Sequence, residues 1–355
     1  MKKIIIVLVL LALMIICVFW LNRDLNVRGT QTAYQEPIII GFSLGTTREE
    51  RWFTDRDLFV QKAQELGAVV SVTLSDYDID SQSSQIENLA SQGAKVIVIV
   101  PSDSEALAPV IARVKAGGVK IIAYDRLIKN SAVDFYLSFD NVKVGELEAS
   151  SIVAVATSSS LKTGEALAFA YLGGAPTDNN SQLLKQGSMK VLEPKIENGE
   201  IKLVIDEFME DWKPDEAYKT IKNYLAAGGE LDAIVAANDG IAFGAIRALE
   251  ERGLAGKIPV SGQDAELAAY QRIFAGTQTS TVYKPISLLA YKAAEIAVAL
   301  ANGRNPEVNN TVNNGWADIP SFFIDSILVT RSNLMGAVIN DGFHTYEEVY
   351  KSGVK

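Results

Sequence analysis

Polar side chains with planar or charged ends follow several apolar stretches of this 355-residue sequence. Asp and Asn oxygens and Arg guanidinium groups can bridge neighbouring hydroxyl groups, and the face of a Trp ring can cover an apolar C–H surface. A pyranose offers both kinds of surface, so the pattern favours a site for a sugar or a similar polar small molecule. The segments concerned are Arg51-Trp52, Asp125-Arg126, Asp178-Asn179-Asn180, Asp211-Trp212, Asn238-Asp239, Gln263-Asp264 and Lys284.

Each of these residues also has an ordinary structural explanation. Asp and Asn after a strand commonly cap helices or form turns, and a single Trp commonly fills a core. The argument for a binding site rests on their recurrence at the same end of successive strands, where the ligands of open α/β sheets bind.

The scarcity of cysteine and histidine excludes most catalytic and metal chemistry. Cys17 is the one cysteine, which excludes an intramolecular disulfide, an iron–sulfur cluster and a thiolate zinc site. His344 is the one histidine, which excludes multi-histidine metal sites, and we expect it on the surface. No glycine-rich phosphate-binding motif follows the first predicted strand. We therefore expect no metal, no cofactor and no nucleotide.

A sugar-processing enzyme stays open as an alternative, because Asp125 and Asp264 could form a pair of carboxylates. A glycosidase needs one carboxyl group to stay protonated, whereas Arg126 and Lys284 nearby would hold both of them ionised. We therefore expect a binding protein without catalytic residues. Incubation with sugar and a search for turnover would distinguish the two.

The charge balance argues against a nucleic-acid partner. The chain carries 43 acidic and 33 basic residues, a formal net charge of −10 at pH 7, with no run of Lys or Arg. Such a surface repels phosphate backbones. With 48% hydrophobic and 21% charged residues, the composition is that of a globular protein rather than a disordered one.

Short β-branched runs alternate with segments of helical periodicity from Pro37 onward. The runs recur at the spacing of a βα unit and are apolar on both faces, as parallel strands are. Two sets of such units predict an α/β protein of two doubly wound, Rossmann-like parallel-sheet domains. The runs are Ile38–Phe42, Ala68–Leu74, Val96–Val100, Val119–Tyr124 and Phe135–Phe139, followed by Ala166–Leu172, Lys202–Ile205, Ala233–Ala236, Pro259–Ser261 and Ser280–Tyr283.

The first 21 residues have the pattern of a signal or anchor segment. Two lysines precede an unbroken apolar run from Ile4 to Leu21, which favours export of everything that follows. A lipoprotein signal would need a small residue where Ile16 stands, and no small-x-small cleavage site follows the run. We interpret the segment as an uncleaved membrane anchor with residues 22–36 as a polar tether, and a cleaved signal peptide is the alternative. Either arrangement places the body outside the cytoplasm.

A series of motifs, in order along the chain, resembles the signature segments of the D-xylose-binding proteins of ABC sugar importers. The resemblance covers about Ile38 to Phe343. It extends to the wider group of ribose- and galactose-binding proteins, the type I periplasmic binding proteins, whose two domains are joined by a three-segment hinge and close on a sugar. The motifs are Glu50-Arg51-Trp52, Ala123-Tyr124-Asp125-Arg126, Ser138-Phe139-Asp140-Asn141, Asp178-Asn179-Asn180, Asn238-Asp239, Gly262-Gln263-Asp264-Ala265, Gly276-Thr277-Gln278 and Thr281-Val282-Tyr283-Lys284-Pro285.

This resemblance implies a division into lobes and a set of ligand residues. A first lobe of residues 37–142 and 286–314 would face a second lobe of residues 143–285 and 315–355. Trp52 and Trp212 would cover the two faces of the sugar. Hydrogen bonds to the sugar would come from Arg51, Asp125, Arg126, Asn180, Asn238, Asp264 and Lys284.

The function that the resemblance implies is reversible sugar capture outside the cytoplasm. A monomeric substrate-binding protein would hold a monosaccharide, D-xylose before other pentoses or glucose, and deliver it to an ABC permease. An uncleaved anchor keeps a second function open, a membrane-anchored sugar sensor that signals to a two-component histidine kinase. A lactose-repressor-type regulator shares the fold, but it would need a basic helix-turn-helix where this chain has an apolar segment.

Overall fold

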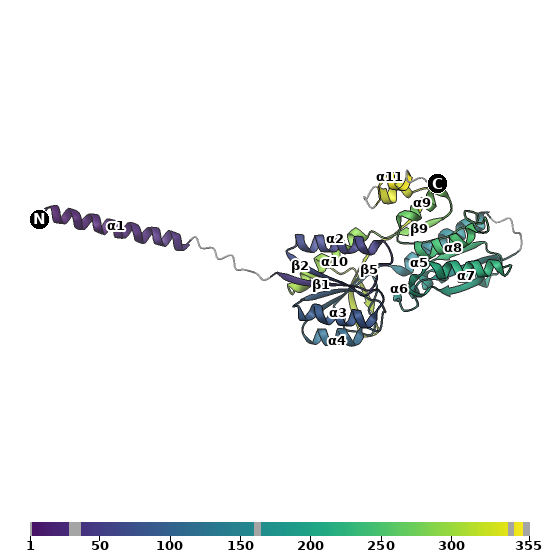
Figure 1. The fold of residues 1–355 in the computed structure, drawn as a ribbon, viewed down its shortest axis with the longest axis horizontal. Helices are drawn as coiled ribbons and strands as arrows, with labels where there is room; N and C mark the ends of the chain where they lie inside the picture. Colours follow the sequence, from purple (N-terminus) through teal and green to yellow (C-terminus); the bar gives the residue numbers. More distant parts are fainter. Residues whose placement is uncertain (1, 28–36, 160–164, 340–343, 351–355) are drawn as a thin grey trace. The chain divides into compact units, whose positions relative to one another are not determined.

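The computed structural model describes residues 2–27, 37–159, 165–339 and 344–350 (Figure 1). The chain divides into two units, Met1–Pro37 and Ile38–Lys355. The first unit contains helix α1 (Lys2–Val27), and residues 28–36 of the predicted tether lie outside the described residues. The predicted membrane anchor receives no support: among the described residues, no helix is both long enough and apolar enough to cross a bilayer.

A sheet in the order β10-β11-β5-β4-β3-β1-β2 forms the centre of the first lobe. Its strands run parallel except at the β10–β11 pair. Every strand predicted for this lobe is present, and two further strands come from late in the chain. The bounds are β1 (Ile38–Leu44), β2 (Ala68–Leu74), β3 (Val96–Val100), β4 (Lys120–Tyr124), β5 (Phe135–Phe139), β10 (Asn310–Asn313) and β11 (Asp318–Ile324).

Helices cover both faces of this sheet because alternate strand residues point to opposite sides. In β3, Val98 packs in a core with α2 (Arg51–Glu65) and α10 (Ile286–Ala301). Its neighbour Ile97 packs on the other face, with α3 (Ile79–Ser91) and α4 (Ala108–Ala116). The continuous apolar composition of the strands therefore follows from burial on both faces.

The second lobe has a parallel sheet in the order β7-β6-β8. The predicted run Pro259–Ser261 does not form a full strand; it adds a single parallel bridge between Ile234 and Val260. The final predicted strand pairs in antiparallel fashion with a late segment of the chain. The bounds are β6 (Leu167–Gly173), β7 (Ile201–Phe208), β8 (Ala233–Ala236), β9 (Ser280–Tyr283) and β12 (Ile327–Thr330).

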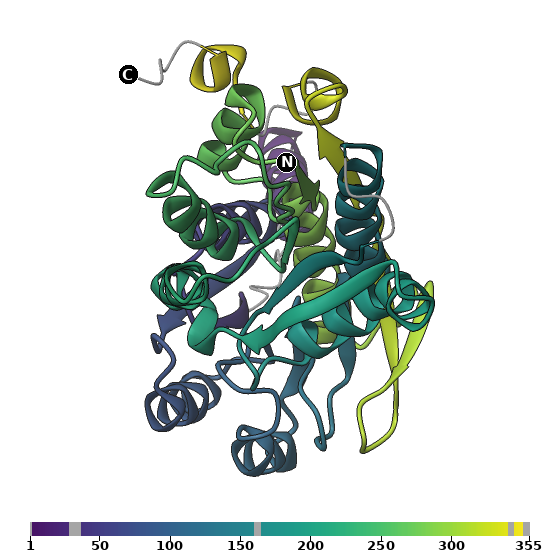
Figure 2. The same ribbon diagram turned by 90° about the vertical axis from the view of Figure 1, so that its right-hand side faces the viewer.

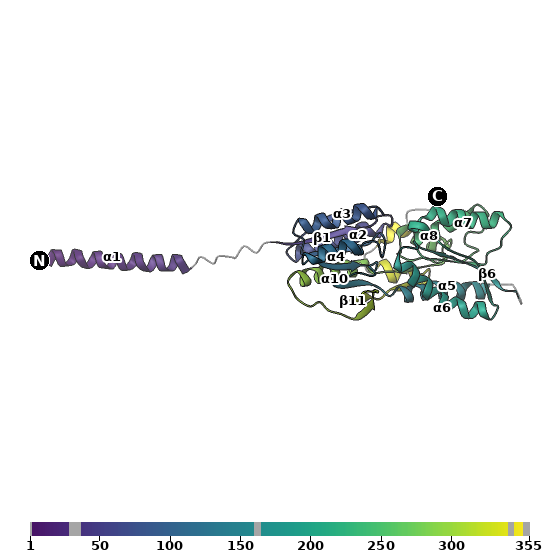
Figure 3. The same cartoon turned by 90° about the horizontal axis from the view of Figure 1, so that it is seen from below.

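Helix pairs cover the two faces of the β7-β6-β8 sheet (Figure 3). On one face α5 and α6 approach so closely that a Cβ added at Gly187 would stand 1.9 Å from the carbonyl oxygen of Val142. Glycine is needed at that crossing because any side chain would collide with the facing backbone. The bounds are α5 (Asn141–Ser159), α6 (Asn179–Glu197), α7 (Pro214–Ala226), α8 (Asp239–Glu250) and α9 (Leu267–Ala275).

Within the described residues, the chain passes between the two lobes three times, after β5, after β9 and after β11. The third passage corrects the predicted lobe boundary. Residues 315–324 were expected in the second lobe, but β11 pairs in parallel with β5 of the first sheet, with Ser321 beside Tyr136. The crossing therefore falls between Ile324 and Ile327 rather than at residue 314.

The last described segment packs on the second lobe, where α11 (Tyr346–Tyr350) lies against α9 (Figure 2). His344, expected on the surface, is buried beside α9 and is 8% exposed. Its Nε2 lies 3.1 Å from the carbonyl oxygen of Ala265, and its ring packs edge-on against Tyr270. Local sequence gave no sign of this burial, because the contacts come from residues more than 70 positions earlier.

Candidate functional site

All nine predicted site residues lie around one cavity between the lobes. The first lobe brings four of them there at the ends of β1 and β4, and the second lobe brings the others at the ends of its own strands and at the β9–α10 crossing. Convergence at this edge follows from parallel strands, whose carboxyl ends all point the same way. The lining comprises Glu49, Arg51, Trp52, Asp125, Arg126, Asp178, Asn180, Trp212, Asn238, Gln263, Asp264 and Lys284.

The turns that carry these side chains contain left-handed backbone at residues other than glycine. The φ angle is 59° at Asp125, 59° at Trp212 and 85° at Asp264. Such conformations cost about 1–3 kcal/mol each and persist only where the surrounding structure enforces them. Their concentration around one cavity indicates that side-chain placement there is maintained against local backbone preference.

Arg51 is the central cation of the first lobe's wall. Its guanidinium group lies 2.9 Å from Asp125, 3.1 Å from Asp55 and, across the cleft, 3.4 Å from Asp264. It also stacks over the ring of Trp52, 4.5 Å from the centroid. Burial opposes ionisation of Asp125, but Arg51 and then Lys284 lower the pKa of that carboxyl below its usual value. Asp125 is therefore an ionised hydrogen-bond acceptor.

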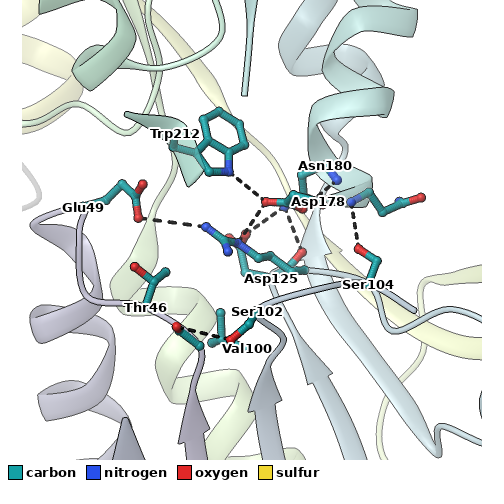
Figure 4. Close-up of polar contacts among 12 residues, drawn as sticks. Thr46, Glu49, Val100, Ser102, Ser104, Asp125, Asp178, Asn180 and Trp212 are labelled. Atoms are coloured by element: carbon teal, nitrogen blue, oxygen red, sulfur yellow. Dashed lines mark hydrogen bonds and ion pairs between the residues drawn. The ribbon is translucent and has the colours of Figure 1, made fainter. Parts of the chain in front are cut away.

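Asp178 connects the two lobes at the opposite wall (Figure 4). Its carboxylate accepts from the indole Nε1 of Trp212 at 3.2 Å and from the backbone N–H of Asn180 at 2.9 Å. It also lies 2.9 Å from Nε of Arg126, which belongs to the first lobe. A second contact across the cleft joins the Asn180 amide to Asp125 at 2.9 Å.

Both tryptophans are held by a carboxylate at the indole nitrogen. Glu49 accepts from Nε1 of Trp52 at 2.6 Å, as Asp178 does from Trp212. Arg126 lies over the Trp52 ring at 5.5 Å. The exposed fraction of Trp52 is 2% and that of Trp212 is 5%, and each residue belongs to a core cluster of its lobe and also lines the cavity.

Asn238 and Lys284 line the cavity and also contact other residues of the protein. The Asn238 side-chain oxygen caps α8 by accepting from the N–H of Ile241 at 2.8 Å, so a ligand contact falls to its NH₂ group. Lys284 lies 3.4 Å from Asp264 and 5.5 Å from the centroid of Phe139. The capping explanation and the binding explanation of Asn238 are therefore compatible.

Glu49, Asp178 and Gln263 line the cavity but were not among the predicted ligand residues. Asp178 and Gln263 belong to strand-end motifs that the sequence had indicated, so a wider choice within those motifs would have included them. Glu49 precedes the Glu50-Arg51-Trp52 motif, and no local pattern distinguishes it from Glu50. Only the direction of its side chain in the folded lobe separates the two.

Contacts between the lobes also occur outside the cavity. The hydroxyl of Ser104 in the first lobe accepts from the backbone N–H of Asn179 in the second, at 2.8 Å (Figure 4). Arg48 donates to the carbonyl oxygen of Asp211 at 2.6 Å. With these contacts and those inside the cavity in place, the space left between the lobes is about 20 Å³. That is room for on the order of one water molecule.

A family model described as "Periplasmic binding protein domain" matches residues 40–305. The chain belongs to the periplasmic binding protein family. Over 318 residues it is 46% identical to the D-xylose-binding periplasmic protein of Escherichia coli (strain K12), covering 89% of this chain and 94% of that protein. It is 47% identical over 322 residues to the D-xylose-binding periplasmic protein of Haemophilus influenzae, covering 90% of this chain and 95% of that one.

Solved structures of solute binding proteins share the fold. The carbohydrate transporter solute binding protein of Chloroflexus aurantiacus, in complex with D-glucose, superposes with a TM-score of 0.81. It is 30% identical in sequence and covers 88% of this chain and 98% of its own. The predicted fold and the resemblance noted in the sequence are both confirmed.

Proposed function

We propose that this protein is an extracytoplasmic substrate-binding protein that captures D-xylose between its lobes and delivers it to an ABC importer. The observation that carries the proposal is the cavity between the lobes, where planar hydrogen-bonding side chains and two tryptophans converge from both sides. Two relatives that align along nearly their whole length are D-xylose-binding periplasmic proteins, which supports the choice of sugar. The carbohydrate transporter relative favours import over signalling to a histidine kinase.

The proposed ligand set divides between the lobes. Arg51, Trp52, Asp125 and Arg126 bind the sugar from the first lobe. Asn180, Trp212, Asn238 and Asp264 bind it from the second, with Lys284 at the crossing. The rings of Trp52 and Trp212 cover the apolar C–H faces, and the charged and amide groups bind the hydroxyls. Because each lobe supplies part of the set, the closed form is the one that satisfies the sugar on all sides.

A sugar is larger than the cavity of about 20 Å³, so the lobes must separate before it enters. Separation breaks the contacts between Arg51 and Asp264, between Arg126 and Asp178 and between Asn180 and Asp125. On closure, hydroxyl groups take the place of part of these contacts. A pentopyranose has about ten non-hydrogen atoms, and about 0.8 kcal/mol for each gives about −8 kcal/mol, a micromolar dissociation constant.

Calorimetric titration of the purified protein against D-xylose, D-glucose and L-arabinose tests the proposal. We expect one binding site per chain, with D-xylose bound most tightly and recovered unchanged after incubation. Failure of every sugar in the panel to bind would refute the proposed function. Conversion of the sugar to a product would instead favour the enzyme alternative.

A further inference from the structure

Glu49 is a buried carboxylate with one oxygen that has a hydrogen-bond partner and one that has none among the described residues. Its Oε2 accepts the hydrogen bond from the indole of Trp52 at 2.6 Å. Its Oε1 is fully buried and has no hydrogen-bond partner among the residues that the structure describes. The residue as a whole is 6% exposed and lines the cavity between the lobes. A buried acceptor left without a donor costs free energy, so this atom has a place for a donor.

Arg126 presents the complementary group on the same wall. Its Nε is paired with Asp178 and its Nη2 lies 3.4 Å from the hydroxyl of Tyr77. Its Nη1 is buried and lacks a hydrogen-bond partner in the described part of the chain. The shortest contact between the two side chains, from Nη2 to Oε2 of Glu49, is 4.0 Å. The unpartnered donor Nη1 and the unpartnered acceptor Oε1 therefore belong to two neighbouring side chains and are at least 4.0 Å apart.

Since the shortest contact between the two side chains is 4.0 Å, they make no direct hydrogen bond, and a hydroxyl group between them could contact both. Two hydrogen bonds of about 2.8 Å that meet at one oxygen span about 4–4.6 Å between their outer atoms. A hydroxyl group donates one hydrogen bond and accepts others, so it can satisfy a carboxylate and a guanidinium together. An ether, a methyl group or a bare carbonyl cannot do so.

We propose that Glu49 is a further sugar-binding residue, which accepts a hydrogen bond from a ring hydroxyl that Arg126 binds at the same time. The proposal rests on the proposed function, since it assigns a new residue to that same site. It gives Glu49 two roles: Oε2 fixes the Trp52 ring, and Oε1 contacts the ligand. The side chain thereby selects sugars that carry a hydroxyl at this place.

Substitution Glu49→Gln separates these two roles. The indole N–H of Trp52 can only donate, so it fixes the amide oxygen on its side and leaves the amide NH₂ in the place of Oε1. The variant therefore keeps the Trp52 contact and turns the ligand acceptor into a donor that faces Arg126. Glu50→Gln is the matched control, because Glu50 is the adjacent residue, is exposed and lies outside this cavity lining.

Titration calorimetry with D-xylose gives the primary result. We expect E49Q to bind about 10- to 150-fold more weakly than the parent, the loss of one charged hydrogen bond, while E50Q binds like the parent. The sugar-free tryptophan emission of E49Q should match that of the parent, since Trp52 keeps its partner. If E49Q does not fold, Glu49→Asp, which keeps the charge but shortens the side chain, should show the same loss.

Several results would overturn the assignment. E49Q binding within threefold of the parent would show that Oε1 does not contact the sugar. A weakened E49Q with shifted tryptophan emission would show that Glu49 acts only by positioning Trp52. Both outcomes leave D-xylose binding by the parent intact and so refute this inference alone, whereas a parent that binds no sugar refutes the proposed function itself.

Discussion

Replacing Asp264 by Asn removes a carboxylate of the second lobe that faces two cations of the proposed site. Its Oδ1 lies 3.4 Å from Nη1 of Arg51 and 3.4 Å from Nζ of Lys284. The residue has a φ angle of 85°, which Asn tolerates better than Ala does. Asp264→Asn therefore removes the charge with little added backbone strain, whereas Asp264→Ala adds strain to the loss of charge.

The expected loss of affinity is large. If the carboxylate accepts from two hydroxyls, and each charged hydrogen bond contributes about 1.5–3 kcal/mol, the variant loses about 3–6 kcal/mol of binding free energy. From a micromolar parent this gives a dissociation constant of about 0.15 mM to 20 mM, at or beyond the limit of calorimetric detection. The Ala variant should bind no more tightly.

A loss of stability should accompany the loss of binding. Arg51 retains Asp55 and Asp125, whereas Asp264 is the carboxylate that Lys284 contacts within the described residues. Leaving a buried cation without its partner costs about 3–5 kcal/mol. A folded protein is stable by about 5–15 kcal/mol, so we expect the variant to fold with a lower melting temperature.

Calorimetry and thermal unfolding of Asp264→Asn, alone and combined with Lys284→Met, distinguish the two effects. The double variant should regain most of the lost stability, because the buried cation that lost Asp264 is removed as well, and it should still fail to bind. Sugar affinity of the single variant within threefold of the parent would refute the placement of Asp264 in the site. A double variant no more stable than the single one would refute the ion-pair argument.

Three further expectations concern other side chains. Trp212→Ala should weaken sugar binding by about 2–4 kcal/mol. Since Trp212 is 5% exposed within a core cluster, the same change should also lower the free energy of unfolding by about 3–5 kcal/mol. A variant that melts at a lower temperature but binds sugar normally would exclude stacking of Trp212 on the sugar. Gly174→Ala places a Cβ 2.2 Å from Cη2 of Trp212, so the indole must shift. We expect the tryptophan emission and the sugar affinity of the variant to change, and unchanged values of both would contradict the close packing of Gly174 against Trp212. Burial, with Asp239 and Asp264 nearby, raises the pKa of Glu266 from 4.5 to about 8. The folded protein therefore holds a proton that the unfolded chain loses between these pH values, and stability falls as the pH rises through that window. Thermal unfolding from pH 5 to pH 9 should show Glu266→Gln gaining stability relative to the parent up to about pH 8, and a constant difference would contradict the shift.

The sequence by itself determined the architecture and the edge of the fold where the site lies. Runs such as Val96–Val100, apolar on both faces, predict parallel strands covered by helices, and the structure has this arrangement. Since parallel strands end at the same edge, polar residues that follow them had to converge. The hydrophobic pattern of each strand is a local property, which is why the sequence reveals it.

Pairings between distant residues were decided only by the tertiary structure. Arg51 and Asp264 are 213 positions apart, and nothing near either residue indicates that they meet. The pairing of β11 with β5, the burial of His344 and the approach of Glu49 to Arg126 have the same origin. A local pattern shows which face of an element is buried, but the partner on that face depends on how the whole lobe packs. For the same reason Glu49 and Glu50, equivalent in the sequence, differ in the fold: the start of α2 directs one into the cavity and leaves the other exposed.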